Sequence, residues 1–385
     1  MVHLMNAVSP DELRSATVVE IIDRPSDFEA LRPQWNELLS ASATASPFLT
    51  WEWVYAWWTH LGERSRLNLF VVRTGGQIVA IAPLRIARRP LTWLSSLEFL
   101  GTGAAGSDYL DLIVRRGCEA VAVEALAGAF QSQGLTLRLS HLPPGSLALR
   151  LAGQMEHGGW TSREAEAGVC PFIRLAGHTW ESYLASLGSA HRANVRRRIR
   201  EVARTFDVRF ELVAGSADRL DVLAALAAFH DRRWSGDRGS TTFATPELHA
   251  FHQDATRRAL DAGYLRLYGL RLDGQLAGAM YAFSHAGRFY FYQHGFDQRY
   301  RQYSLGLFLM ALTIRAAIDE GAVEFDLLYG IESYKRLWTA ETRPLGRLDL
   351  FPARVGGRLH RRRVDAESAL RALAQRMRSR DGHAA

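Results

Sequence analysis

The chain repeats one short phrase at a distance of 198 residues. VRTGGQIVAIAPL occupies residues 72–84 and LRLDGQLAGAMYA occupies residues 270–282, with Gln77 aligned on Gln275. Each phrase contains a β-rich run, a two-residue turn with glycine and a second apolar run, which predicts a β-hairpin. Because a distant repeat indicates a duplicated structural unit, the sequence predicts two similar domains in tandem.

The elements predicted after each hairpin follow the same order: a strand, a helix and a strand. This order predicts an α/β (α+β) fold with two tandem domains, each a mixed, mainly antiparallel sheet flanked by helices. Further helices are predicted at 180–187, 191–206, 220–234 and 246–262. We expect a loose leader with one helix at 1–46, a first domain at 47–165, a second domain at 166–352 and a basic tail at 353–385.

The composition excludes several classes of protein. A chain of 385 residues with 48% hydrophobic residues is typical of a globular protein of two or three domains. Its two cysteines cannot form a disulfide framework or a zinc site by themselves, and no set of His, Cys and carboxylates has metal-ligand spacing. The N-terminal residues lack the features of a signal peptide, and no apolar run reaches the ~20 residues that span a bilayer. We therefore expect a cytoplasmic location and no metal.

The net charge of +7 is concentrated at the C-terminus, where residues 353–385 carry nine Arg against three acidic residues. Such a distribution does not indicate DNA binding. It predicts at most a weak contact of the tail with an anionic membrane surface. Lys335 is the only lysine among 47 basic residues.

The most informative turn is RQYSLG at 301–306, which follows a predicted strand and opens a long apolar helix. Unpaired backbone N–H groups and the helix dipole at such a turn favour phosphate. The alternative interpretation is an ordinary helix start with Ser304 as N-cap. The predicted phosphate-binding residues are Arg301, Gln302, Tyr303, Ser304, Leu305, Gly306 and Leu307.

This order of elements resembles the GNAT acyltransferase superfamily, whose acyl-CoA loop reads Q/R-x-x-G-x-G/A. The turn Arg301-x-x-Ser304-x-Gly306 is similar to that loop, with serine in place of the first glycine. Four further segments resemble the CelD-like branch, which is associated with exopolysaccharide and cellulose synthesis: HRANVRRRIR from His191, HDRRW from His230, YSLG from Tyr303 and DLLYGIESYKRLW from Asp326. The chain is also similar to the Fem aminoacyl transferases of the cell wall, which pair two GNAT-like units.

The resemblance implies an N-acyltransferase, with acetyl-CoA or another acyl-CoA as co-substrate bound at the 301–307 turn. The acceptor would be an amine of a small molecule or a polysaccharide precursor. The corresponding turn of the first domain, VRRGCEAV, lacks the loop spacing, so we expect only the second domain to bind the donor.

The catalytic candidates follow the last predicted strand of the second domain. Tyr329 and Tyr334 are candidate acids for the leaving thiolate, and Asp326 and Glu332 are candidate bases. Lys335 would bind an anionic group of a substrate, although a solvated lysine among core aromatics is the alternative. Candidate acceptor-binding residues are His230, Arg233 and Trp234.

Three alternatives stay open at this point. The Arg-rich helix at 191–204 is either a solvated surface or a face that grips phosphate. The donor could be aminoacyl-tRNA, as in the Fem transferases, with the basic helix and tail on the RNA backbone. The serine in the turn also permits a non-catalytic scaffold in a polysaccharide-synthesis complex.

Overall fold

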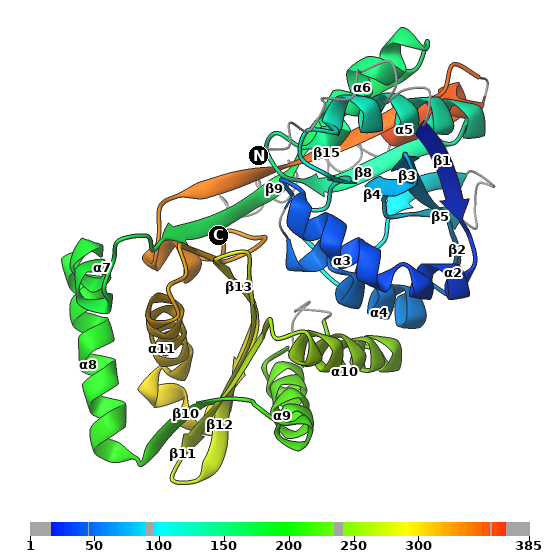
Figure 1. Cartoon of the computed structure of the whole chain (residues 1–385). Helices are drawn as coiled ribbons and strands as arrows, with labels where there is room; N and C mark the ends of the chain where they lie inside the picture. Colours follow the sequence, from blue (N-terminus) through cyan, green and yellow to red (C-terminus); the bar gives the residue numbers. More distant parts are fainter. Residues whose placement is uncertain (1–16, 45, 89–94, 235–241, 355, 367–385) are drawn as a thin grey trace, which may run out of the picture.

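A computed structural model describes residues 17–44, 46–88, 95–234, 242–354 and 356–366, and the side chains of 231–234 are not described (Figure 1). The strands form a four-stranded sheet of order β1-β3-β4-β7 and an eleven-stranded sheet of order β10-β11-β12-β13-β14-β9-β15-β8-β6-β5-β2. Helices cover the faces of both sheets (Figure 1). This arrangement confirms the predicted α/β fold with mixed, mainly antiparallel sheets.

The repeated phrase forms the same structure twice. β3 and β4 are an antiparallel hairpin, as are β11 and β12, and each hairpin lies between two further antiparallel strands. Both hairpins shift register at corresponding points, so that Val79 and Ala277 are extra residues on the second strand. Arg73 and Arg271 each donate to the carbonyl of the turn glycine, at 3.4 Å in both cases. The four strands of the small sheet therefore correspond to β10, β11, β12 and β13.

The N-terminal half comprises the elements before β9. α5 packs on one face of the small sheet and α3 on the other (Figure 1). α5 ends at Gln133, because Gly134 adopts a left-handed conformation that stops the helix. The elements of this half are β1 (Thr17–Ile22), α2 (Pro25–Ala30), α3 (Arg32–Ala41), η1 (Pro47–Leu49), α4 (Trp51–Leu61), β2 (Ser65–Leu67), β3 (Leu69–Thr74), β4 (Gln77–Ala82), β5 (Leu84–Arg88), β6 (Ser95–Phe99), β7 (Ile113–Val114), α5 (Glu119–Gln133), β8 (Thr136–Leu142) and α6 (Leu147–His157).

The C-terminal half comprises the elements from α7 to η3. α9 packs against β11, β12 and β13, and α11 packs against β12 and β13 together with α7 and α8. The elements are α7 (Trp180–Ser186), α8 (Ser189–Thr205), β10 (Val208–Leu212), α9 (Ser216–Trp234), α10 (Pro246–Asp261), β11 (Leu265–Leu272), β12 (Gln275–His285), β13 (Arg288–Phe296), η2 (Gln298–Tyr303), α11 (Leu305–Asp319), β14 (Glu324–Asp326) and η3 (Lys335–Leu337).

Two long strands join the halves. β9 (Thr161–Arg174) pairs with β14 at its C-terminal end and with β15 (Thr342–Phe351) along the rest, and β15 also pairs with β8. The predicted boundary between residues 165 and 166 falls inside β9. An aromatic core continues across the halves, since Trp53 of α4 packs on Phe283 and Tyr292 and Thr50 shares a 2.9 Å hydrogen bond with Tyr264.

The structure differs from the prediction at both ends. Residues 17–41 are not a loose leader, because β1 pairs with β3 along its whole length and α2 and α3 replace the single expected helix. Residues 356–366 of the predicted tail are helical, with His360 and Val364 each only 2% exposed. Residues 1–16 and 367–385 lie outside the described parts of the chain. Among the described residues, no helix is long and apolar enough to cross a membrane.

Candidate active site

The predicted phosphate-binding turn joins β13 to α11. Ser304 has a left-handed backbone (φ 55°) and its hydroxyl does not cap the helix, so the N-cap interpretation of its side chain is wrong. The amides of Leu307 and Phe308 donate to the Ser304 carbonyl. By helix geometry, the amides of Leu305 and Gly306 before them have no acceptor within α11. Two N–H groups at the positive end of the helix dipole therefore remain for a ligand.

Gly306 allows α11 to approach β13 closely. A Cβ atom at this position would lie 3.1 Å from the Phe296 ring and 3.5 Å from Nε2 of His294. Packing therefore favours glycine here, as would a phosphate at the turn. The approach brings the N-terminus of α11 against the last residues of β13.

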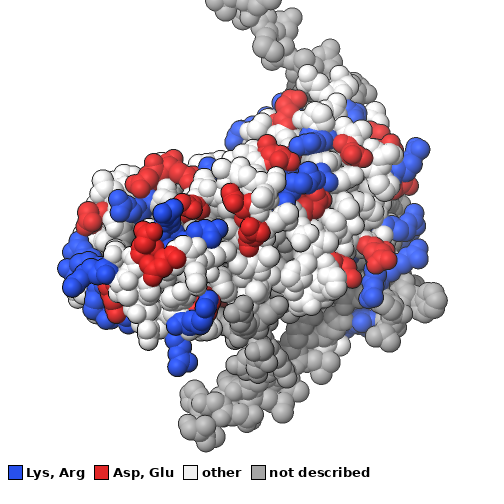
Figure 2. All heavy atoms as spheres, turned by 90° about the horizontal axis from the view of Figure 1, so that it is seen from below, with Lys and Arg blue, Asp and Glu red and all other residues white. Residues whose placement is uncertain are grey.

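The Arg-rich helix α8 lies beside this turn. Arg198, whose side chain is 18% exposed, donates to the carbonyl of Gln302 at 2.9 Å. Phe206, directly after α8, packs edge-on against Tyr303, and Val195 and Val202 are buried. Basic side chains gather at the left end of the face in Figure 2, where Figure 1 places α8. The exposed arginines of α8 are Arg196, Arg197, Arg200 and Arg204.

β13 and β14 pair in parallel for three residues and then separate. Tyr290 and Asp326 form the last rung, after which β13 continues to Phe296 while β14 ends. β14, which corresponds to the last predicted strand of the second domain, is therefore short, and Leu328 (φ 55°) turns the chain out of the sheet. Within β13, Tyr281 pairs with Gln293 and Ala282 with Phe291, which leaves Tyr292 as an extra residue. A bulge thus lies beside the point where the two strands separate.

Asp326, a predicted base, lies at that point and is 0% exposed. Its carboxylate accepts hydrogen bonds from the Tyr109 hydroxyl (2.6 Å), from Arg343 (2.9 Å) and from the Leu328 amide (2.8 Å). Burial raises the pKa of Asp326 to about 6, and these hydrogen bonds oppose the rise. Because Tyr109 belongs to the N-terminal half, the site is built from both halves.

Lys335 is buried, with 3% exposure, and its ammonium faces the protein. Nζ donates to the carbonyl of Tyr329 at 2.7 Å and lies 2.9 Å from a carboxylate oxygen of Glu332. The lysine thus closes the turn that carries Tyr329 and Glu332. These two side chains are about half exposed (51% for Tyr329 and 53% for the Glu332 side chain), whereas Tyr334 packs edge-on against His294 at 5.7 Å.

Asp108 is a member of the site that the sequence analysis missed. Its carboxylate accepts the Tyr329 amide at 2.8 Å and the Cys170 thiol at 3.9 Å. Burial raises the pKa of Asp108 to about 7. The segment SDYLDL offered a signal, since two carboxylates interrupt an otherwise apolar run.

Of the predicted acceptor-binding residues on α9, the structure describes the side chain of His230. His230 is 8% exposed, and its Nε2 lies 3.1 Å from the carbonyl oxygen of His294 on β13. The side chains of Arg233 and Trp234 lie outside the described residues. Within the described ranges, no group of three or more His, Cys, Asp or Glu side chains could hold a metal ion.

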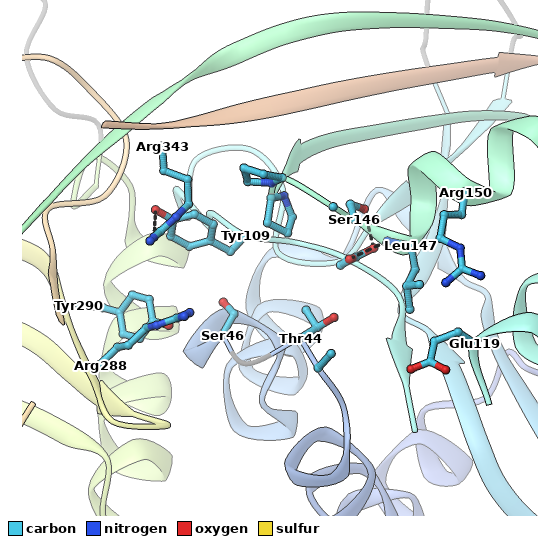
Figure 3. A pocket seen from close by; sticks show the side chains of 15 residues that line it. Thr44, Ser46, Tyr109, Glu119, Ser146, Leu147, Arg150, Arg288, Tyr290 and Arg343 are labelled. Carbon is cyan, nitrogen blue, oxygen red and sulfur yellow. Dashed lines mark hydrogen bonds between the residues drawn. The ribbon is translucent and has the colours of Figure 1, made fainter. Parts of the chain in front are cut away.

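A cavity of about 480 Å³ lies between the halves (Figure 3), and two of its lining residues, Tyr109 and Arg343, hydrogen-bond to Asp326. We call it the interface cavity. Tyr109, Tyr290, Arg288 and Arg343 gather at one end, and Arg150 and Glu119 lie toward the other (Figure 3). The lining residues are Ala43, Thr44, Ser46, Tyr109, Asp111, Glu119, Pro143, Pro144, Gly145, Ser146, Leu147, Arg150, Arg288, Tyr290 and Arg343.

Comparison with known proteins matches part of the chain to a domain family. Residues 189–336 match the family model of the acetyltransferase (GNAT) domain. This range includes the predicted phosphate-binding turn, β13, β14 and Lys335. The chain therefore carries a segment that matches a GNAT acetyltransferase domain, and this match supports an enzyme. No curated protein sequence matches the chain.

Solved structures extend the similarity over both halves. The crystal structure of FemX has a TM-score of 0.59 at 9% identity, covering 86% of this chain and 96% of FemX. The C-terminal domain (DUF2156) of a putative lysylphosphatidylglycerol synthetase from Agrobacterium fabrum has a TM-score of 0.53 at 11% identity, covering 85% and 92% of the two chains. L-PGS from Bacillus licheniformis has a TM-score of 0.51 at 13% identity, covering 85% and 91%. At these identities the similarity concerns the fold.

Proposed function

We propose that the chain is an acyl-CoA-dependent N-acyltransferase that uses acetyl-CoA or another acyl-CoA. The acceptor is an amine of a small molecule or a polysaccharide precursor. The observation that carries the proposal is the uncapped turn at Ser304, beside the point where β13 and β14 separate and inside the matched GNAT domain. Pyrophosphate would accept the amides of Leu305 and Gly306, with Arg301 at the rim.

The thioester of the donor would lie along β13 beyond its last rung with β14. There the amine nitrogen attacks the thioester carbonyl, the C–S bond breaks, the amine loses a proton and the thiolate gains one. The bulge at Tyr292 is where backbone groups leave the ladder and can face the developing oxyanion. Tyr334 is the candidate acid on the side of α11, and Tyr329 is the candidate acid on the side of β9.

Glu332 and Asp326 are the two candidates for the base that takes the amine proton. Glu332 is exposed and could take the amine proton directly, while its contact with Lys335 holds it near the turn. Asp326 is fully buried, so a proton would reach it through Tyr109, whose hydroxyl donates to Asp326 and which lines the interface cavity. Lys335 acts in this proposal by positioning the turn.

Calorimetric titration of CoA tests the donor site. We expect Arg301→Gln to weaken CoA binding about tenfold or more, since a charge-assisted contact to phosphate is lost. Arg315→Gln is the matched control, because it removes the same charge from the exposed side of α11. Gly306→Asp is a poor test, since its side chain would collide with Phe296. Equal CoA affinity in wild type and Arg301→Gln would place the donor elsewhere.

A Fem-like transfer from aminoacyl-tRNA is the second candidate. The fold similarity to FemX and the exposed arginines of α8 beside the turn favour it. In that case Arg200→Gln and Arg204→Gln would weaken tRNA binding, and each would reduce the salt dependence of log K by about one unit of slope. CoA binding without tRNA binding would exclude this candidate.

A further inference from the structure

The interface cavity contains a guanidinium group whose charge the protein only partly neutralises. Arg288 and Arg343 both face Glu324. Arg343 uses two nitrogens on that carboxylate, at 3.1 and 2.8 Å, and also reaches Asp326 at 2.9 Å. Arg288 is left with a 3.6 Å contact through Nε and with a hydrogen bond to the Tyr290 side chain. The paired, fork-like geometry belongs to Arg343, and a guanidinium has more N–H donors than the contacts of Arg288 with Glu324 and Tyr290 use. Arg288 therefore keeps donors for a ligand.

The backbone of Arg288 is held in the sheet, and its side chain is accessible from the cavity. It is the first residue of β13, two residues before Tyr290, which forms the last rung with Asp326. Its side chain is 42% exposed, and Figure 3 shows it beside Tyr290 at the end of the cavity where Tyr109 and Arg343 lie. A volume of about 480 Å³ is within the range of small-ligand sites.

The other charged side chains of the cavity either make hydrogen bonds within the protein or lie far from Arg288. The carboxylate of Asp111 accepts the amides of Leu147 and Ala148 and thereby caps α6. Glu119 and Arg150 lie toward the opposite end of the cavity (Figure 3). Arg150 is exposed and makes no ion pair with any described residue, and it extends from a helix on the far side of the site.

We propose that the interface cavity is the acceptor site, and that the acceptor amine also carries an anionic group, a carboxylate or a phosphate, which Arg288 binds. The group would sit on Arg288 while the amine reaches the separation of β13 and β14 beside Tyr290. This inference rests on the proposed acyl transfer for the identity of the amine. The anion site itself does not depend on the donor.

Anion binding is measured without any acyl donor. Inorganic phosphate and, separately, acetate are titrated calorimetrically into wild type, Arg288→Gln, Arg150→Gln and Arg301→Gln. We expect Arg288→Gln to weaken binding about ten- to a hundredfold, and the other two variants to keep wild-type affinity for the cavity ion. The anion that binds more tightly distinguishes a phosphate from a carboxylate acceptor. Thermal melts confirm that each variant is folded.

Three results of these titrations overturn the proposal. Loss of binding in Arg150→Gln alone would move the anion to the other end of the cavity, and loss in Arg301→Gln alone would assign it to the donor turn. Unchanged affinity in every variant would show that the cavity has no anion site. With acetyl-CoA present, glucosamine 6-phosphate and glucosamine serve as a matched pair of amine probes for release of free thiol. Selective loss of the phosphorylated amine in Arg288→Gln is expected, and equal use of both amines by wild type contradicts the proposal.

Discussion

The carboxylate of Asp108, in the N-terminal half, accepts the backbone N–H of Tyr329, in the C-terminal half, at 2.8 Å. Tyr329 begins the turn that Lys335 closes from the other side through the Tyr329 carbonyl. One residue is thus held through its amide by the first half and through its carbonyl by a lysine of the second. The candidate catalytic turn therefore depends on both halves of the chain.

This contact predicts how stability changes with pH. The folded-state pKa of Asp108 is raised from 3.8 to about 7, so between these values the folded chain binds more protons than the unfolded chain. The contribution of Asp108 is therefore greatest below pH 4 and is lost as pH rises to 7. Asp326 and Asp111, each raised to about 6, act in the same direction. We expect the free energy of unfolding of wild type to fall between pH 5 and pH 8.

Asp108→Asn isolates the contribution of one group. The amide oxygen can still accept the Tyr329 amide, but the side chain no longer ionises. The variant should lose part of the pH dependence, on the order of 1–3 kcal/mol after allowance for relaxation around a buried charge. Urea denaturation at pH 5 and pH 8 measures it. A pH dependence identical to wild type would show that Asp108 does not titrate in this range.

Local patterns predicted the parts of the fold that local interactions determine. The two hairpins depend on alternating apolar residues and glycine turns, and α5 ends at Gly134 because its backbone is left-handed. The sequence analysis did not predict β15. Its partner strands, β8 and β9, lie nearly 200 residues earlier in the chain, and strand formation depends on such partners. Within the site, the 301–307 turn follows from spacing. The burial of Asp326 and Lys335 depends on tertiary packing around Tyr109 and Tyr329. Local sequence patterns do not reveal such contacts between distant residues.

The backbone of Ser304 predicts a stabilising substitution. A non-glycine residue with φ 55° is strained, whereas glycine adopts that conformation freely. Ser304→Gly should raise the free energy of unfolding by about 0.5–1 kcal/mol, after the greater flexibility of glycine in the unfolded chain is counted. CoA affinity should be kept, since the backbone amides stay in place.

Ala286→Gly is the matched control, because Ala286 has φ 49° in a turn far along β12 and β13 from the donor site. Both variants should be stabilised by similar amounts in urea melts. Destabilisation by Ser304→Gly alone would mean that its hydroxyl has a structural partner at the turn.

The contacts of the C-terminal residues predict different effects of two truncations on stability. Cutting after Pro352 removes Val364 and His360, which are buried, and the 3.0 Å pair of Arg163 with Asp365. Loss of one buried valine side chain alone costs about 1.5–3 kcal/mol, so this truncation should lower the melting temperature. Cutting after Ala366 should leave both stability and acyl transfer unchanged.

Liposomes of anionic lipid test the proposed membrane contact of the tail. Both truncations should reduce sedimentation with the vesicles, because each removes basic residues that attract anionic lipid. The cut after Pro352 removes all nine tail arginines, and the cut after Ala366 removes four of them, Arg371, Arg376, Arg378 and Arg380. Unchanged sedimentation after the cut at Ala366 would show that the last residues make no such contact.

Lys335 carries the last prediction. Its ammonium is buried among the carbonyls of Leu328 and Tyr329, with the Glu332 carboxylate 2.9 Å away. Lys335→Met keeps the length of the side chain but removes these hydrogen bonds, so it should lower the free energy of unfolding by about 2–4 kcal/mol. Lys335→Arg should also destabilise, because a planar guanidinium does not fit the compact site of an ammonium. Arg336→Gln, at the exposed neighbouring position, should change stability by no more than about 0.5 kcal/mol. Near-native melts for Lys335→Met, with transfer activity reduced ten- to a hundredfold, would instead support the prediction from sequence that Lys335 contacts a substrate anion. A reduction of about that size is expected when one charge-assisted contact is lost.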